Sequence, residues 1–65
     1  MSIWKVQFNN HTAEIFKDNT HYHFYFDGEW NVSDRIGKFQ NDEDAIETWR
    51  KICAFPKNYV NLVIK

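Results

Sequence analysis

Cysteine, proline, glycine and leucine are all scarce in this chain of 65 residues. The lone cysteine, Cys53, cannot form an internal disulfide, and no cysteine pair exists for a zinc ribbon. One proline and two glycines leave little scope for a flexible linker or a disordered tail. These absences predict one compact domain over residues 1–65, which either works in a reducing compartment or is indifferent to redox state.

Long hydrophobic runs and a strong excess of either charge are also absent. No apolar stretch approaches the roughly 20 residues of a membrane span, and residues 1–5 lack the basic and then apolar order of a signal peptide. The formal net charge of −1 gives no general electrostatic attraction for nucleic acid. We therefore expect a cytoplasmic protein that makes no membrane contact.

Aromatic side chains, by contrast, make up 18% of the chain. A domain this short buries only about 60% of its unfolded surface, so bulky residues must supply the core. Residues 21–26 carry a ring at every position, and a strand sends alternate side chains to opposite faces. The predicted core face receives Tyr22, Phe24 and Phe26, and the other face receives His21, His23 and Tyr25.

Two shorter apolar–polar alternations precede this run and predict an antiparallel meander of three strands. Asn9-Asn10 and Asp18-Asn19 suit the two tight turns, since asparagine tolerates positive φ. This register sets Val6 opposite Ala13, Trp4 opposite Ile15, Ile15 opposite Tyr22, and Ala13 opposite Phe24, all on one face. The predicted rows on the other face are Ile3–Phe16–His21, Lys5–Glu14–His23 and Gln7–Thr12–Tyr25.

A fourth strand and a helix are expected next. We expect a three-residue turn at residues 27–29 that keeps Trp30 and Val32 in the core, and then a connection over residues 33–39. Asn41 precedes three acidic residues, which is typical of a capped helix start, and Pro56 ends the helix. The predicted inward stripe is Ala45, Ile46, Trp49, Ile52 and Cys53. Residues 59–64 predict a last strand with Val60, Leu62 and Ile64 inward.

The predicted fold class is therefore α+β. It consists of a small four- to five-stranded, mostly antiparallel sheet, in the order ββββαβ, with a single helix packed on one face. One helix cannot cover both faces of a sheet. The face opposite the helix, called the open face below, is left for solvent or a partner.

Residues suited to catalysis or metal binding are few. His21 and His23 share a face, but a metal site needs further ligands. The register keeps His11 roughly 10 Å from His21, at about 3.3 Å per residue of strand. Cys53 falls on the buried side of the helix, and no argument from the sequence places a base beside either serine. The sequence therefore predicts no enzyme, no metal site and no cofactor.

The open face is the strongest candidate for a binding site. It is rich in rings and poor in charge, as interface cores are, and such a patch on a small chain favours a protein partner or a homodimer. Edge-strand addition by the last strand and contacts through the acidic residues 42–47 are alternatives. The predicted contact residues are Ile3, Phe16, His21, His23, Tyr25 and Val63.

The same face predicts an alternative function, nucleic-acid binding, in which bases stack on the aromatic side chains of the sheet. Such binding needs positive charge, and Lys5 is the only cation in the predicted rows. The stretch from Ile36 to Ala45 (IGKFQNDEDA) resembles the strand-to-helix junction of AP2-type DNA-binding domains. The resemblance implies a sheet backed by one helix, although the basic and tryptophan residues with which that family grips DNA are mostly missing from this sheet.

Size and composition are similar to those of small phage and mobile-element proteins, among them anti-CRISPR and other anti-defence inhibitors. Such proteins cover a surface of a host protein. The resulting hypothesis is a non-enzymatic protein-binding module that acts through its open face, as a small inhibitor of a host defence protein.

Overall fold

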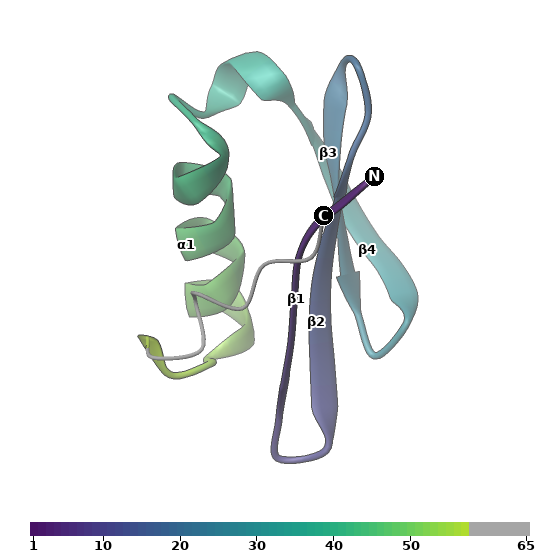
Figure 1. The fold of residues 1–65 in the computed structure, drawn as a ribbon, viewed down its shortest axis with the longest axis vertical. Helices are drawn as coiled ribbons and strands as arrows, with labels where there is room; N and C mark the ends of the chain where they lie inside the picture. Colours follow the sequence, from purple (N-terminus) through teal and green to yellow (C-terminus); the bar gives the residue numbers. More distant parts are fainter. Residues whose placement is uncertain (58–65) are drawn as a thin grey trace.

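The computed structural model describes residues 1–57. The strands are β1 (Ser2–Phe8), β2 (His11–Lys17), β3 (His21–Phe26) and β4 (Glu29–Arg35), followed by the 3₁₀ helix η1 (Ile36–Lys38) and the α-helix α1 (Asp42–Cys53). The strands form one antiparallel sheet in chain order, and α1 lies along one side of it (Figure 1). The predicted fold class is thus confirmed. The predicted last strand, residues 59–64, and Val63 within it lie outside the described residues.

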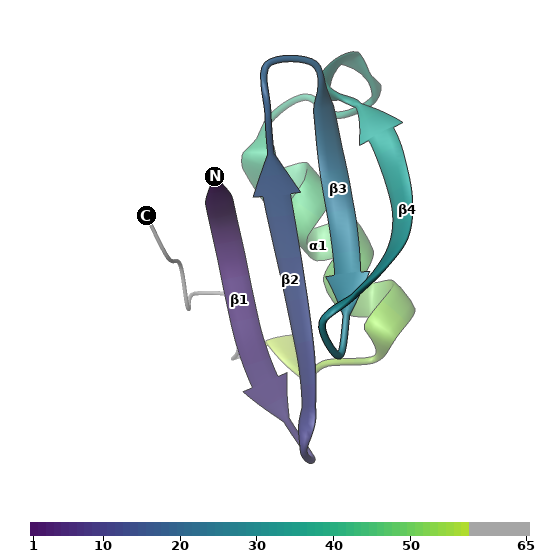
Figure 2. The same ribbon diagram turned by 90° about the vertical axis from the view of Figure 1, so that its right-hand side faces the viewer.

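The core lies between the sheet and α1. Figure 2 looks onto the open face, with α1 behind the sheet. Phe24 and Trp49 join the two layers, with ring centroids 5.3 Å apart. The buried residues include six of the seven predicted for β1 to β3, and the seventh, Phe26, is partly buried and packs against them. The buried residues are Trp4, Val6, Ala13, Ile15, Tyr22, Phe24, Ala45, Ile46, Trp49 and Phe55.

The first hairpin has the predicted register, with Trp4 opposite Ile15 and Val6 opposite Ala13. Asn9 and Asn10 form its turn with φ of 52° and 64°, in the left-handed region that asparagine tolerates best after glycine. The register is irregular between Ser2 and Trp4. Next to this irregularity, Ile3 packs against the core instead of standing clear of it.

The predicted register of the second hairpin is wrong by two residues. Ile15 lies opposite Phe24, and Ala13 lies opposite Phe26. The cause is Asp18, whose Oδ1 accepts the backbone N–H groups of Thr20 and His21, both at 2.8 Å. This local bonding moves the turn one residue along the chain. A slip of two residues leaves each side chain on its predicted face.

The slip does change the rows of the open face. Glu14 lies between Lys5 and Tyr25, and His23 lies opposite Phe16. The predicted placement of Glu14 beside His23 is therefore wrong.

The third hairpin has a two-residue turn instead of the predicted three. Asp27 and Gly28 have φ of 51° and 81°, and Phe26 lies opposite Glu29. This turn sets Trp30 opposite Tyr25, and an irregularity between Tyr25 and Phe24 then sets Val32 opposite Phe24. Trp30 is consequently 61% exposed, and Val32 is 38% exposed, so the predicted core position of each is wrong. The expected connection at residues 33–35 is in fact the end of β4.

The helix begins as predicted. The Asn41 side chain accepts the Asp44 N–H at 2.9 Å, and three acidic residues occupy the first turn. The helix ends at Cys53, three residues before the proline, with Ala54 in the left-handed conformation. No helix in residues 1–57 is long and apolar enough to cross a membrane.

One member of the predicted inward stripe is misplaced. Ile52 is 66% exposed, whereas Ala45, Ile46 and Trp49 are buried and Cys53 packs against the core. At about 100° per residue, Ile52 falls at the margin of the stripe. There it lines a groove of about 260 Å³ together with Phe26, Asn31, Trp49 and Cys53.

Candidate functional site on the open sheet face

The open face carries rings from three strands. Phe16 of β2 and Tyr25 of β3 meet edge to face, with centroids 5.1 Å apart. His21 and His23 stack along β3 at 6.0 Å. The structure thus brings together four of the six predicted contact residues. Ile3 packs against the core cluster instead.

A tryptophan that the sequence placed in the core joins this face. The Trp30 indole Nε1 donates to the Ser33 Oγ at 2.9 Å, and Ser33 lies opposite His23. Trp30 therefore stands on the edge strand beside Tyr25, and most of its surface is exposed. The Asp27-Gly28 pair in the sequence could have predicted this position of Trp30, because such a pair favours a two-residue turn.

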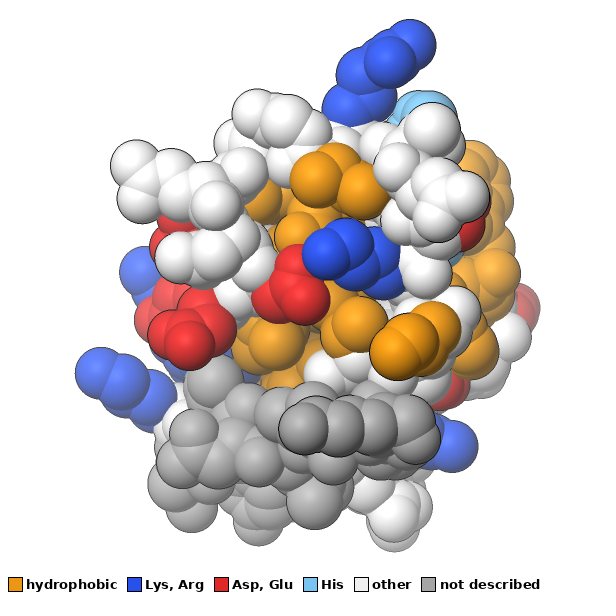
Figure 3. Space-filling model, turned by 45° about the horizontal axis from the view of Figure 1, so that its top comes forward, with side chains coloured by type: hydrophobic (Ala, Val, Ile, Leu, Met, Phe, Trp, Pro, Cys, Tyr) orange, Lys and Arg blue, Asp and Glu red, His pale blue; other side chains and the backbone are white. Residues whose placement is uncertain are grey.

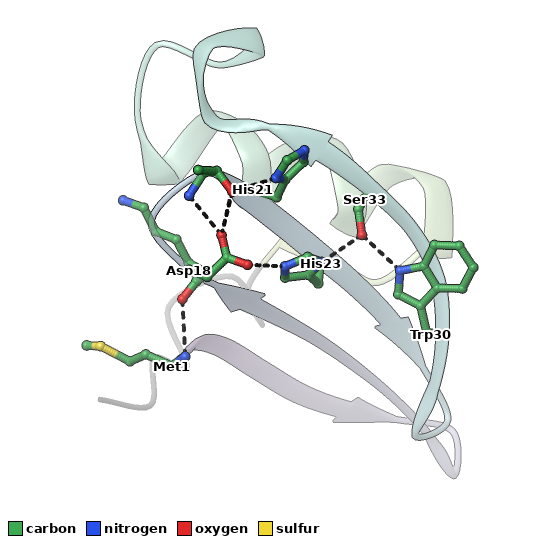
Figure 4. A network of polar contacts seen from close by, with 8 residues as sticks. Met1, Asp18, His21, His23, Trp30 and Ser33 are labelled. Carbon is green, nitrogen blue, oxygen red and sulfur yellow. Dashed lines mark hydrogen bonds and ion pairs between the residues drawn. The ribbon is translucent and has the colours of Figure 1, made fainter.

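A chain of polar contacts connects the β2–β3 turn to β4 across this face (Figure 4). The Asp18 Oδ2 lies 2.6 Å from the His23 Nε2. The other ring nitrogen, Nδ1, lies 2.7 Å from the Ser33 Oγ. No pattern in the sequence placed a base beside Ser33, and the structure puts the His23 imidazole there.

The Asp18 carboxylate is stabilised in its charged form. The contact with His23 lowers the pKa of Asp18 most, and the backbone N–H groups of Thr20 and His21 lower it further. Each of these groups bonds better to the carboxylate than to the protonated acid. Asp18 is therefore an anion at neutral pH and only accepts hydrogen bonds.

A second cluster of hydrogen-bonded side chains lies at the end of the molecule near this turn. The Asp42 Oδ1 accepts from the Lys17 Nζ at 2.8 Å and from the Tyr22 hydroxyl at 2.5 Å. In Figure 3, which brings this end forward, hydrophobic side chains occupy the middle of the view, with acidic and basic side chains among them. The cluster ties the start of α1 to β2 and β3.

The remaining candidates for chemistry are dispersed. His11 lies at the Phe26 end of β3, as predicted, with the two rings stacked at 5.3 Å. No group of three or more His, Cys, Asp or Glu within residues 1–57 is placed to hold a metal ion. Burial, with a smaller contribution from the charge of Asp27, raises the pKa of the Cys53 thiol to about 11. The thiol is therefore protonated at neutral pH.

Comparison with family models, with curated proteins and with solved structures gives no match.

Proposed function

We propose that this protein is a non-enzymatic protein-binding module whose open face docks onto a partner protein. The observation that carries the proposal is the exposure of Trp30, at 61%, beside the Phe16–Tyr25 pair on the face away from α1. Tryptophan and tyrosine are the residue types that most often dominate binding energy at protein interfaces. Burying these rings would remove a large apolar area from water.

The proposed partner is a host defence protein, because the chain is similar in size and composition to small phage and mobile-element inhibitors. A second copy of this chain is the other protein partner to test. The single free cysteine fits a cytoplasmic setting.

The test is affinity capture from a host lysate, with the parent and three variants as bait. We expect Trp30→Ala and Tyr25→Glu to weaken binding of the captured partner by about 30-fold or more, as loss of a hot spot of about 2 kcal/mol would. Ile52→Glu is the matched control, since Ile52 is exposed on α1 rather than on the open face. If the open-face variants retain binding and Ile52→Glu loses it, the proposal that the open face is the contact surface is wrong. Light scattering on the same variants reports self-association.

Nucleic-acid binding is the second candidate. It is favoured by the addition of Trp30 to Phe16 and Tyr25, because stacking of a base on an aromatic ring is worth about 1–3 kcal/mol. Lys5 is exposed on this face, but it lies opposite Glu14, which opposes phosphate binding. Binding of single-stranded oligonucleotides that weakens steeply with added salt would favour this candidate over a protein partner.

A further inference from the structure

In the chain of polar contacts across the open face, the direction of hydrogen-bond donation is fixed at both ends. The Trp30 indole N–H can only donate, so the Ser33 Oγ accepts from it. The ionised Asp18 carboxylate can only accept, so the His23 Nε2 donates to it.

The directions of these two outer hydrogen bonds determine the direction of the bond between His23 and Ser33. With its proton on Nε2, a neutral imidazole has a lone pair on Nδ1. In this neutral form, the Ser33 hydroxyl hydrogen points at the His23 Nδ1, across an O···N distance of 2.7 Å. A serine hydroxyl that donates to an imidazole, which is itself held by a carboxylate, is the arrangement that activates a nucleophile.

The backbone around Ser33 also suits an acyl-transfer step. The Ile36 N–H donates to the Thr20 carbonyl oxygen at 3.0 Å. Hydrogen-bonded pairs alternate along an antiparallel ladder, so Ser33 and His23 form a non-hydrogen-bonded pair, in which side chains approach closely. The Ser33 N–H then points away from β3, toward the outer edge of the described sheet, where it can donate to an oxyanion.

Solvent reaches this group of residues. The side chains of His23 and Asp18 are 30% and 54% exposed, and Ser33 is half-buried. The exposed indole of Trp30 and the ring of Tyr25 flank Ser33 and His23, which favours an aromatic group on the incoming molecule.

We propose that Ser33 is an activated nucleophile that accepts an acyl group from aryl esters, with His23 as general base and Asp18 as the residue that orients the imidazole. The Ser33 Oγ attacks the ester carbonyl carbon as its proton moves to the His23 Nδ1. The bond to the aryl oxygen breaks, its electron pair leaves with the aryl oxide, and His23 returns the proton to that oxide. This reactivity goes beyond the proposed binding function and does not depend on it.

The test is acetylation of the full chain by 4-nitrophenyl acetate, with the acetyl group located by peptide mass spectrometry. We expect an acetyl ester on Ser33 that neutral hydroxylamine removes, whereas acetylated amines resist it. Ser2, the other serine, donates to the Glu14 carboxylate at 2.9 Å and serves as an internal control. We expect Ser33 to react at least about 100-fold faster than Ser2, in line with the contribution of a general base.

Two variants separate the roles of the neighbouring residues. His23→Gln should slow Ser33 acetylation by about 10²-fold or more, because glutamine cannot accept the Ser33 proton as a general base. Asp18→Asn keeps an oxygen acceptor for the turn but removes the anion, and it should slow acetylation by about tenfold or more. Circular dichroism checks that each variant is folded, and parent protein unfolded in urea should lose the selectivity for Ser33.

Equal acetylation of Ser33 and Ser2 in the folded parent would overturn the proposal. So would a His23→Gln variant that reacts at the parent rate.

Discussion

Asp42 is the residue that joins the first turn of α1 to the sheet. Its Oδ1 accepts from Lys17 and Tyr22, and the Lys17 ammonium lies 5.4 Å from the centroid of the Tyr22 ring. The bond from Lys17, followed by that from Tyr22, lowers the pKa of Asp42. Burial, followed by the bond to Asp42, raises the pKa of Tyr22 to about 12. The contact therefore depends on a protonated phenol and an ionised carboxyl.

Tyr22→Phe tests this contact, because it removes the hydroxyl and keeps the ring. We expect it to lower the free energy of unfolding at neutral pH by about 1.5–3 kcal/mol, the worth of a hydrogen bond to a charged group. The folded pKa of Tyr22 lies above the ordinary value of 10.0, so its contribution is constant below pH 10. It is lost as the pH rises toward about 12.

The measurement is urea unfolding at neutral pH and in the alkaline range. The parent should lose this contribution above pH about 10, and Tyr22→Phe should lack that loss. Tyr25→Phe is the matched control and should behave as the parent does. An alkaline loss that is the same in the parent and in Tyr22→Phe would contradict the prediction.

At the scale of elements, the turns decide which residues meet on the open face. Asp27-Gly28 closes the third hairpin in two residues, which sets Trp30 opposite Tyr25 and so turns it out of the core. Asp18 closes the second hairpin one residue later than its sequence suggests, which brings His23 opposite Phe16. Turn chemistry thus positions both the rings and the polar chain.

Gly28→Ala tests the third turn. A Cβ at Gly28 meets no atom within 4 Å, but the backbone there has φ of 81°. We expect a loss of about 1–2 kcal/mol in the free energy of unfolding, the cost of a left-handed conformation for an L-residue. Gly37→Ala is the control, since a Cβ there also meets no atom within 4 Å and its φ lies outside the positive range. Equal effects of the two substitutions on urea unfolding would rule out backbone strain as the cause.

At the scale of the whole molecule, within residues 1–57, α1 covers one face of the sheet and leaves the open face uncovered. Trp49 of α1 contacts the sheet at β3. Its ring packs on Phe24, and its Nε1 donates to the Tyr25 carbonyl oxygen at 3.0 Å. Trp49 thus contacts β3 through the Phe24 side chain and the Tyr25 backbone.

Trp49→Ala and Trp30→Ala compare the two layers directly. We expect Trp49→Ala to lower the free energy of unfolding by about 3–5 kcal/mol, as loss of a buried aromatic does. Trp30→Ala should change it by less than about 1 kcal/mol, because the side chain is 61% exposed. Thermal unfolding followed by circular dichroism distinguishes them, and similar melting temperatures for both variants would contradict the separation of layers.

The sequence by itself determined the faces of the first three strands, their order and the start of the helix. Strand alternation, asparagine turns and the Asn41 cap each depend on only a few neighbouring residues. They can therefore be predicted from the sequence alone. The register of the second hairpin is an instructive case. Its prediction was wrong by two residues, yet each side chain kept its face, because the strand period is two.

Only the tertiary structure decided which side chains meet. An irregularity between the pairs Tyr25–Trp30 and Phe24–Val32 shifts β4 by one residue and sets Ser33 opposite His23, and no local pattern marks that position. Asp18, His23 and Ser33 meet because two turns settle into registers that depend on side-chain bonds and backbone twist. Contacts between strands depend on register across the whole hairpin, and so they lie beyond what a local pattern specifies.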